Sequence, residues 1–200
     1  NECPSNVDIS KLKSEALQHY YDANGYNVNT LLVSYLPRLQ AMASIAPFLY
    51  NWVVSCGFTS KILKNILGFA PERTLPKIHN CNFEKEITKH SQKSFKKTIY
   101  LFIDEFSRYQ DTEIAKTSIK LFSVLGYKVK KAPIKDSGRT AISKGMLKRA
   151  KQIANKNIKT LLPLIDETTP LVGIEPSATL SFRDEYPDLV NSDIRKLTQN

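Results

Sequence analysis

One uninterrupted apolar run places the tightest constraint on the fold. Residues 98–103, Thr-Ile-Tyr-Leu-Phe-Ile, favour a strand throughout, and the absence of polar alternation is typical of a strand buried on both faces. The run stops at Asp104-Glu105, and a helical pattern follows over 111–125. A strand covered on both faces needs helices on either side of its sheet, which indicates an α/β domain.

The same alternation continues through the C-terminal half. Residues 127–132 and 171–174 are predicted strands, and a turn at 136–138 leads into a long helix. The apolar residues of that helix recur on one face, namely Met146, Leu147, Ala150, Ile153, Ala154, Ile158, Leu161 and Leu162. A further helix begins after Glu175. The order β-α-β-α-β-α predicts a parallel sheet with right-handed crossovers.

The N-terminal third has a different character. Its first seventy residues are predicted to be helical, with Asp8 as the cap of the first helix, Gly25 at its end, and Gly68 closing a later helix. Residues 71–97 are rich in turn formers and have no clear period. We therefore predict a helical segment over 1–70, a connector over 71–97 and the α/β domain over 98–200.

The carboxyl ends of parallel strands meet at one edge of a sheet, where ligands usually bind. Eight residues are expected there: Asp104, Glu105, Asp136, Ser137, Gly138, Arg139, Glu175 and Ser177. Asp136, Glu175 and Arg139 could form a site for a hard cation or a small anion. Alternatively, Asp136, Ser137 and Ser177 are turn formers and helix caps. The lack of histidine or cysteine at this edge favours the second interpretation.

The net charge of +10 is concentrated in one stretch. Residues 128–159 contain eleven lysines and arginines and a single acid, Asp136. Such a stretch can attract nucleic acid, anionic lipid or an acidic partner, or it can be a solvated helix face, which we favour. No aromatic residue lies among these basic residues, which argues against stacking on single-stranded nucleic acid.

Cysteine use bears on the cellular compartment. Cys3, Cys56 and Cys81 lack the spacing of a disulfide framework, which fits a reducing environment. No apolar run reaches the roughly 18 residues of a membrane span. These features predict a cytoplasmic protein, with peripheral association at the inner face of the membrane as an alternative. The start at Asn1, with neither methionine nor a signal peptide, suggests a piece of a longer protein.

Two stretches resemble known families. Residues 2–8, with Cys3 followed by Pro4, look like the end of a bacterial-type ferredoxin motif, whose last cysteine precedes proline. The resemblance implies that Cys3 is a [4Fe–4S] ligand in the intact protein and an orphan in this chain, because the other ligands would lie upstream.

The second resemblance covers residues 137–145, 175–178 and 182–186, supported by the linker at 67–73. These segments resemble the cysteine-rich CCG domain of glycolate oxidase iron–sulfur subunits, and above all that of FAD-linked oxidases acting on glycolate, D-lactate or D-2-hydroxyglutarate. The motif's cysteines are missing: Asp104 or Glu105, Asp136-Ser137 and Ala178 stand at their positions. A degenerate edge without thiolates is not expected to bind a cluster or zinc.

The resemblance implies the C-terminal module of a flavin- and iron–sulfur-dependent 2-hydroxyacid oxidoreductase, serving as scaffold or docking element. It implies no catalytic residue and no cofactor in this chain. FAD and [4Fe–4S] clusters would belong to upstream domains of the same protein, which are the expected partners, and the electron acceptor is left open. The alternative is a cluster-free interaction domain with a basic partner-binding face, nucleic acid being the less favoured partner.

Overall fold

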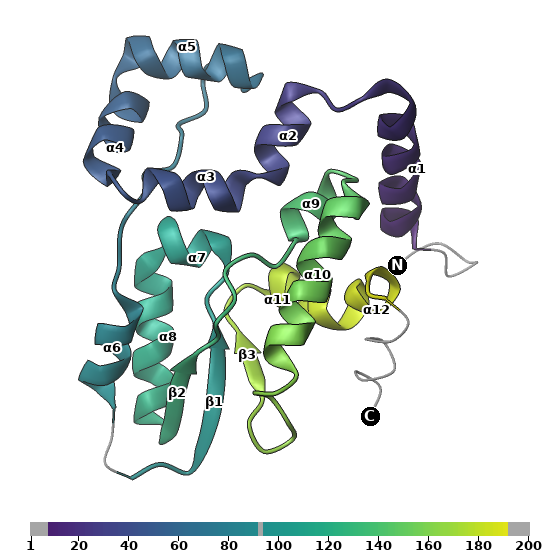
Figure 1. Cartoon of the computed structure of the whole chain (residues 1–200). Helices are drawn as coiled ribbons and strands as arrows, with labels where there is room; N and C mark the ends of the chain where they lie inside the picture. Colours follow the sequence, from purple (N-terminus) through teal and green to yellow (C-terminus); the bar gives the residue numbers. More distant parts are fainter. Residues whose placement is uncertain (1–7, 92–93, 192–200) are drawn as a thin grey trace.

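The computed structural model describes residues 8–91 and 94–191. A group of helices formed by the N-terminal part of the chain lies over one end of an α/β unit (Figure 1). These helices are α1 (Ile9–Asn24), α2 (Val28–Ser34), α3 (Leu36–Ala43), α4 (Pro47–Ser55) and α5 (Gly57–Leu67). Asp8 caps α1 by accepting from the Ser10 N–H, and Gly25 and Gly68 end α1 and α5 as predicted.

The segment predicted to be an irregular connector contains a helix, α6 (Phe83–His90). The Asn82 side chain caps α6, while glutamates in its first turn and Lys89 and His90 in its last turn complement the helix dipole. Phe83 and Ile87 pack against the core of the α/β unit. The prediction of no regular structure here was wrong, because two apolar contacts are too few to produce a visible period. The boundaries 1–70, 71–97 and 98–200 stay predictions.

The sheet has three parallel strands, β1 (Lys97–Phe102), β2 (Tyr127–Lys131) and β3 (Leu171–Gly173), in the order β2-β1-β3. Ile99 pairs with Val129, and Leu101 pairs with Val172. The predicted α/β class with a helical N-terminal region is therefore confirmed. The central position of β1 explains why its sequence is apolar without alternation: neighbours flank it on both sides and helices cover both faces.

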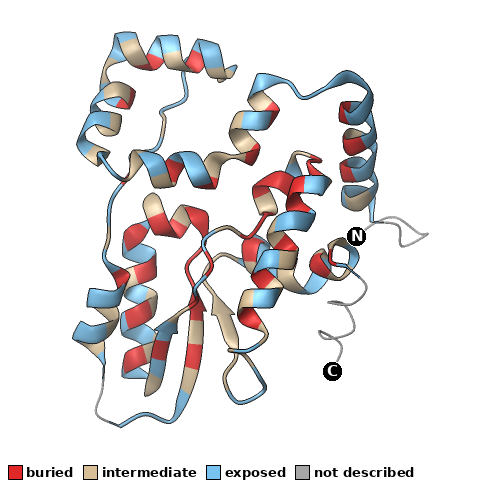
Figure 2. Ribbon diagram, in the orientation of Figure 1, coloured by how far each residue is buried: buried red, intermediate tan, exposed pale blue. Residues whose placement is uncertain are grey.

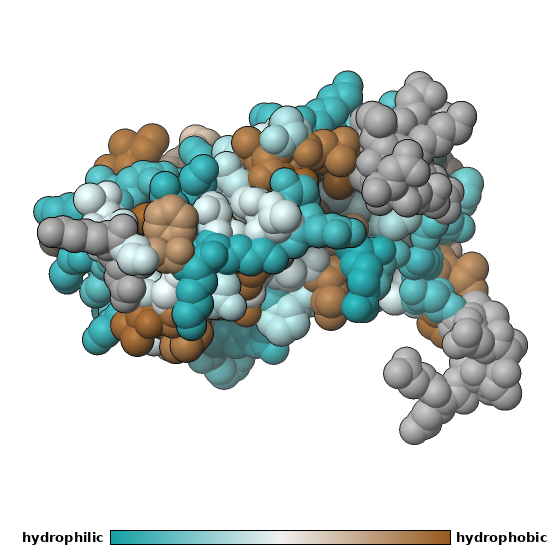
Figure 3. Space-filling view, turned by 90° about the horizontal axis from the view of Figure 1, so that it is seen from below, coloured by the Kyte–Doolittle hydropathy of each residue, from teal (hydrophilic) through white to brown (hydrophobic). Residues whose placement is uncertain are grey.

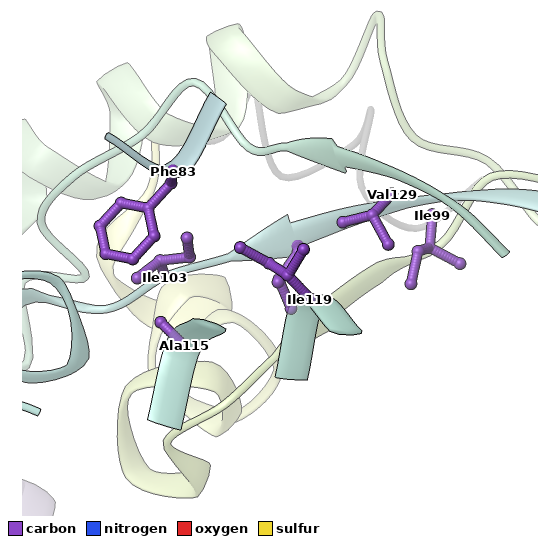
Figure 4. Packing of buried hydrophobic residues seen from close by; sticks show 7 residues of the cluster. Phe83, Ile99, Ile103, Ala115, Ile119 and Val129 are labelled. Atoms are coloured by element: carbon purple, nitrogen blue, oxygen red, sulfur yellow. The ribbon is translucent and has the colours of Figure 1, made fainter. Parts of the chain in front are cut away.

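Helices cover the two faces of this sheet. The helices of this unit are α7 (Glu105–Tyr109), α8 (Thr112–Val124), α9 (Arg139–Ser143), α10 (Leu147–Leu161), α11 (Pro176–Asp184) and α12 (Tyr186–Leu189). Of these, α8 packs on one face, and α10 and α11 pack on the other. On one face, Ala115 and Ile119 of α8 meet Ile99, Val129 and Phe83 (Figure 4). On the other face, Phe102 packs against Leu161 and Ala178.

The periodic apolar residues of α8 do not all face the core. Ile114, Leu121 and Leu125 recur at helical spacing in the sequence, yet each is about half exposed. Ala115 and Ile119, which lie one position further round the helix, are fully buried instead. The small side chain of Ala115 allows α8 to approach the sheet closely, which a search for large apolar residues does not detect.

The carboxyl end of the sheet is covered by the N-terminal helices, with α3 packed on α7 and α2 on α9 (Figure 1). The Ser34 carbonyl accepts hydrogen bonds from Arg149 Nε at 3.3 Å and Thr140 Oγ1 at 3.4 Å. Ser14 Oγ donates to the Ile142 carbonyl at 3.1 Å. At the opposite end, where the strands begin, the surface is mostly hydrophilic with separate hydrophobic groups (Figure 3). Within the described parts of the chain, no helix is both long and apolar enough to cross a membrane.

Gly173→Ala is expected to lower the free energy of unfolding by about 1–3 kcal/mol through overpacking. A Cβ at this position would overlap Thr179 Oγ1 and lie 2.8 Å from Thr179 Cβ, so β3 and α11 would have to separate. Gly57→Ala is the matched control, because a Cβ there meets nothing within 4 Å. Urea denaturation followed by circular dichroism measures both variants. Equal midpoints would show that the contact between β3 and α11 is loose.

Candidate functional site

The direction of the chain across the sheet reverses at β1, because β2 lies on one side of it and β3 on the other. In parallel sheets, ligands bind beside the carboxyl ends of the strands at such a switch point. Asp104 follows β1, the turn at 136–138 follows β2, and Glu175 follows β3. The structure thus places the acids on the segments expected, and the contacts of each side chain show what it does there.

Asp104 acts as a helix cap. Its carboxylate is fully buried, and Oδ1 accepts from the backbone N–H groups of Phe106 at 2.8 Å and Ser107 at 3.0 Å. One turn later in α7, Arg108 Nη2 donates to the carbonyls of Ile103 at 2.9 Å and Ile134 at 3.1 Å. Burial lowers the pKa of Arg108. This guanidinium therefore ties the end of β1 to the segment that follows β2.

Glu105 and Ser137 form the centre of the edge, and both are fully buried. Ser137 Oγ donates to Glu105 Oε1 at 2.8 Å, and the Ser137 N–H points to Oε2 at 3.3 Å. Burial raises the pKa of Glu105 to about 7, and the charge of Asp136 adds to the rise, while the hydrogen bonds from Ser137 oppose it. A carboxyl group with this pKa changes protonation near neutrality.

Asp136 connects the edge to the N-terminal helices. Its Oδ1 accepts from the Gly138 N–H at 2.8 Å, and its Oδ2 lies 3.7 Å from Arg149 Nη2. The Arg149 guanidinium in turn stacks 3.7 Å from the centre of the Tyr35 ring, an arrangement that favours a cation. Burial raises the pKa of Asp136, although the Gly138 hydrogen bond and Arg149 oppose the rise.

The side chains of the remaining predicted residues have other partners, although the Arg139 N–H donates to Ser137 Oγ at 3.1 Å. Glu175 caps α11, accepting from the Ala178 N–H at 2.6 Å and Ser177 Oγ at 2.7 Å. Burial acts to raise the pKa of Glu175, but the hydrogen bonds outweigh this effect and the pKa is lowered. Arg139 pairs with Glu185 at 2.6 Å. Ala178, at a predicted cysteine position, is buried in the core beside Phe102.

Tyr186 stabilises the turn at 136–138 through a hydrogen bond to its backbone. Its hydroxyl donates to the Ser137 carbonyl at 2.8 Å and accepts from Asn157 Nδ2 at 2.9 Å. Asn157 Nδ2 also donates to the Asp136 carbonyl at 2.7 Å. Both side chains are buried, so the backbone of the turn is held from α10 and α12 together.

Six buried side-chain atoms of the described residues have no hydrogen-bond partner, and all lie on α2, α3, α7 or α10 or at the end of β1: Ser34 Oγ, Gln40 Oε1, Gln40 Nε2, Asp104 Oδ2, Arg108 Nε and Arg149 Nη2. These six atoms belong to five residues. Sequence reasoning missed Ser34, Gln40 and Arg108. The one signal in the sequence was for Arg108, which lies four residues after Asp104, the acid that follows the apolar strand.

The residues at this edge do not fit an iron–sulfur cluster, because oxygen atoms and an alanine methyl group stand where thiolates would be needed. Within residues 8–91 and 94–191, no group of three or more histidine, cysteine or acidic side chains could hold a metal ion. The alternative of a hard-cation site built on Asp136 and Glu175 therefore finds no support in this arrangement. Cys56 and Cys81 lie on other segments, and Cys3 lies outside the described residues.

Some of the basic side chains at 128–159 are paired with acids of the same chain. Four of its eleven basic side chains form ion pairs: Lys131 with Glu84, Arg139 with Glu185, Lys148 with Asp22, and Arg149 with Asp136. Two of those four partners precede the α/β domain as we delimited it. These four charges therefore join parts of the chain to one another.

The fold and the edge define an α/β domain whose ligand-binding position is occupied by its own polar side chains. The chain is similar to the D-2-hydroxyglutarate dehydrogenases of Pseudomonas putida, with 27% identity over 198 residues, and of Escherichia coli, with 24% over 197 residues. Each match covers 92% of this chain and 19% of the relative.

A third relative is a subunit of the anaerobic glycerol-3-phosphate dehydrogenase of Escherichia coli, with 23% identity over 198 residues, 97% of this chain and 50% of the relative. The chain thus spans about a fifth of the first two relatives and half of the third. No protein-family model and no solved structure matches. The relatives support the oxidoreductase part of the prediction, and they do not support glycolate oxidase specifically.

Proposed function

We propose that this chain is the C-terminal module of a flavin- and iron–sulfur-dependent 2-hydroxyacid oxidoreductase, and that it serves as a scaffold and docking element. The observation that carries the proposal is the edge of the sheet, where Asp104 caps a helix, Glu105 binds Ser137 and Arg108 ties two strand ends together. These side chains are engaged in holding the fold.

The identity of the relatives supports D-2-hydroxyglutarate as the leading substrate of the intact enzyme, ahead of D-lactate and glycolate. FAD and [4Fe–4S] clusters would be bound by other domains, since the described residues of this chain supply neither thiolates in a set nor a glycine-rich phosphate loop. The electron acceptor is not assigned.

The test is to purify the complete gene product without oxygen and to measure iron, acid-labile sulfide, flavin and dye-linked oxidation of the three hydroxyacids. We expect flavin, iron and oxidation of D-2-hydroxyglutarate. A colourless product without iron or flavin would contradict the proposal and favour the basic interaction domain, for which steeply salt-dependent binding to nucleic acid would be the sign.

A further inference from the structure

The N-terminal helices contain a long stretch without charge. The 22 residues from Leu39 to Ser60 include no Asp, Glu, Lys or Arg, and they form the last turns of α3, all of α4 and the start of α5. In a chain of which 24% is charged, such a stretch would be expected in a buried core.

These helices are instead largely exposed. Figure 2 shows mainly pale blue and tan along α4 and α5, and the exposed fractions are 84% for Ile45, 85% for Phe48, 57% for Trp52 and 76% for Phe58. We call six large apolar residues the apolar hairpin face: Met42, Ile45, Phe48, Trp52, Phe58 and Ile66. Six exposed apolar side chains of this size within 25 residues indicate an interaction surface.

The rest of the chain fixes the orientation of the hairpin. Asn51 Nδ2 donates to the Ile78 carbonyl and Asn51 Oδ1 accepts from the Ile78 N–H, both at 2.8 Å. Lys64 Nζ donates to the Pro71 carbonyl at 2.8 Å. The segment at 71–78 therefore occupies one side of the hairpin, and Phe48, Trp52 and Phe58 remain on the outside.

The charges around the face indicate what would cover it. Residues 25–82 contain five basic residues and a single acid, Glu72; the basic residues are Arg38, Lys61, Lys64, Arg73 and Lys77. An apolar, aromatic centre depleted of charge is the composition of a protein–protein interface core. Four of the five basic residues, all except the buried Lys64, are exposed, and they favour a partner that carries acidic residues around a complementary apolar patch.

The geometry points to the apolar hairpin face as the surface that docks onto the remaining polypeptide of the dehydrogenase, through an apolar patch with an acidic rim. This inference rests on the proposed function. About four-fifths of each D-2-hydroxyglutarate dehydrogenase lies outside the matched region, which provides such a partner. We favour this face over the basic stretch at 128–159 as the docking surface, since four of the eleven basic residues there are already paired within the chain.

Hydroxyl-radical footprinting read by mass spectrometry tests the docking, because Met42, Phe48, Trp52 and Phe58 are reactive and native. Rates are compared between the 200-residue chain and the complete gene product. We expect roughly tenfold slower oxidation of these four residues in the complete product, as for side chains in an interface core. Leu121 and Val124 on α8, 53% and 68% exposed, are internal controls and should react equally in both.

A second measurement uses substitution in the complete product. Phe48→Glu should restore oxidation at Trp52 and Phe58, whereas Leu121→Glu should not. Equal rates in chain and complete product would overturn the inference. Protection that appears in the 200-residue chain alone and grows with its concentration would also overturn it, because it indicates that a second copy covers the face. Protection that requires anionic phospholipid vesicles would overturn it as well. Iron and flavin content, measured on the same sample, reports separately on the proposed function.

Discussion

Tyr186→Ala is expected to lower the free energy of unfolding by about 3–5 kcal/mol, the usual cost of deleting a buried aromatic side chain. Tyr186 is 1% exposed and packs against Phe182 with ring centres 4.8 Å apart. Its loss would leave a cavity beside Ala154 and Val190. It would also remove a hydrogen bond to the turn carbonyl of Ser137.

Tyr186→Phe separates these two contributions. The ring stays and only the hydroxyl is lost, so we expect a cost of about 1–2 kcal/mol for the Ser137 carbonyl and the Asn157 amide left with fewer partners. Urea denaturation of both variants at one pH gives the comparison. If the phenylalanine variant lost as much stability as the alanine variant, the hydroxyl would outweigh the ring and the packing argument would fail.

Glu105 is expected to make the protein less stable as the pH rises from about 4.5 to 7. Its pKa is raised from 4.5 to about 7 in the folded state, so the folded protein holds a proton that the unfolded chain has released. Stability is then fully present below the unfolded pKa and is lost as the pH rises through the folded one. The shift corresponds to about 3 kcal/mol. The charged groups of the network around it are Asp136 and Arg108, and the raised pKa of Asp136 acts in the same direction.

Glu105→Gln should remove most of this pH dependence. The glutamine carbonyl can still accept from the Ser137 hydroxyl, while its amide group faces the Ser137 N–H less favourably. At pH 8 the variant avoids the cost of the buried charge but loses the favourable contact with the Ser137 N–H. We therefore expect it to be more stable than the wild type by about 1–2 kcal/mol. Unfolding free energies at several pH values between 4 and 8 decide the matter. Parallel curves for the two proteins would show that Glu105 is not the titrating group.

Much of the fold could be predicted because its signals are local. The run at 98–103 identified β1, and the apolar face of α10 appeared at helical spacing. The cap at Asp8 and the glycine ends of α1 and α5 are short-range chemistry that a sequence displays directly. Helix α6 was missed because its stability comes from packing Phe83 and Ile87 on the sheet, which is a tertiary contact.

The candidate site was predictable only as a location. Parallel topology brings Asp104, Glu105 and Asp136 to one edge of the sheet, and this follows from strand order alone. Whether a carboxylate there binds a ligand or caps a helix depends on backbone N–H groups that no residue pattern reveals. The roles of Ser34 and Gln40 depend on helices α2 and α3 lying across that edge, an arrangement between segments over sixty residues apart.

The coverage of the sheet edge by α2 and α3 has a consequence for the order of assembly during synthesis. Helices α2 and α3 leave the ribosome before the α/β domain, yet Ser34 can meet Thr140 and Arg149 only after more than a hundred further residues have been synthesised. β3 also pairs with β1 only after about seventy further residues. Until then Asp104 and Glu105 remain hydrated, so the covered edge of the sheet is completed only late in the synthesis of this part of the protein.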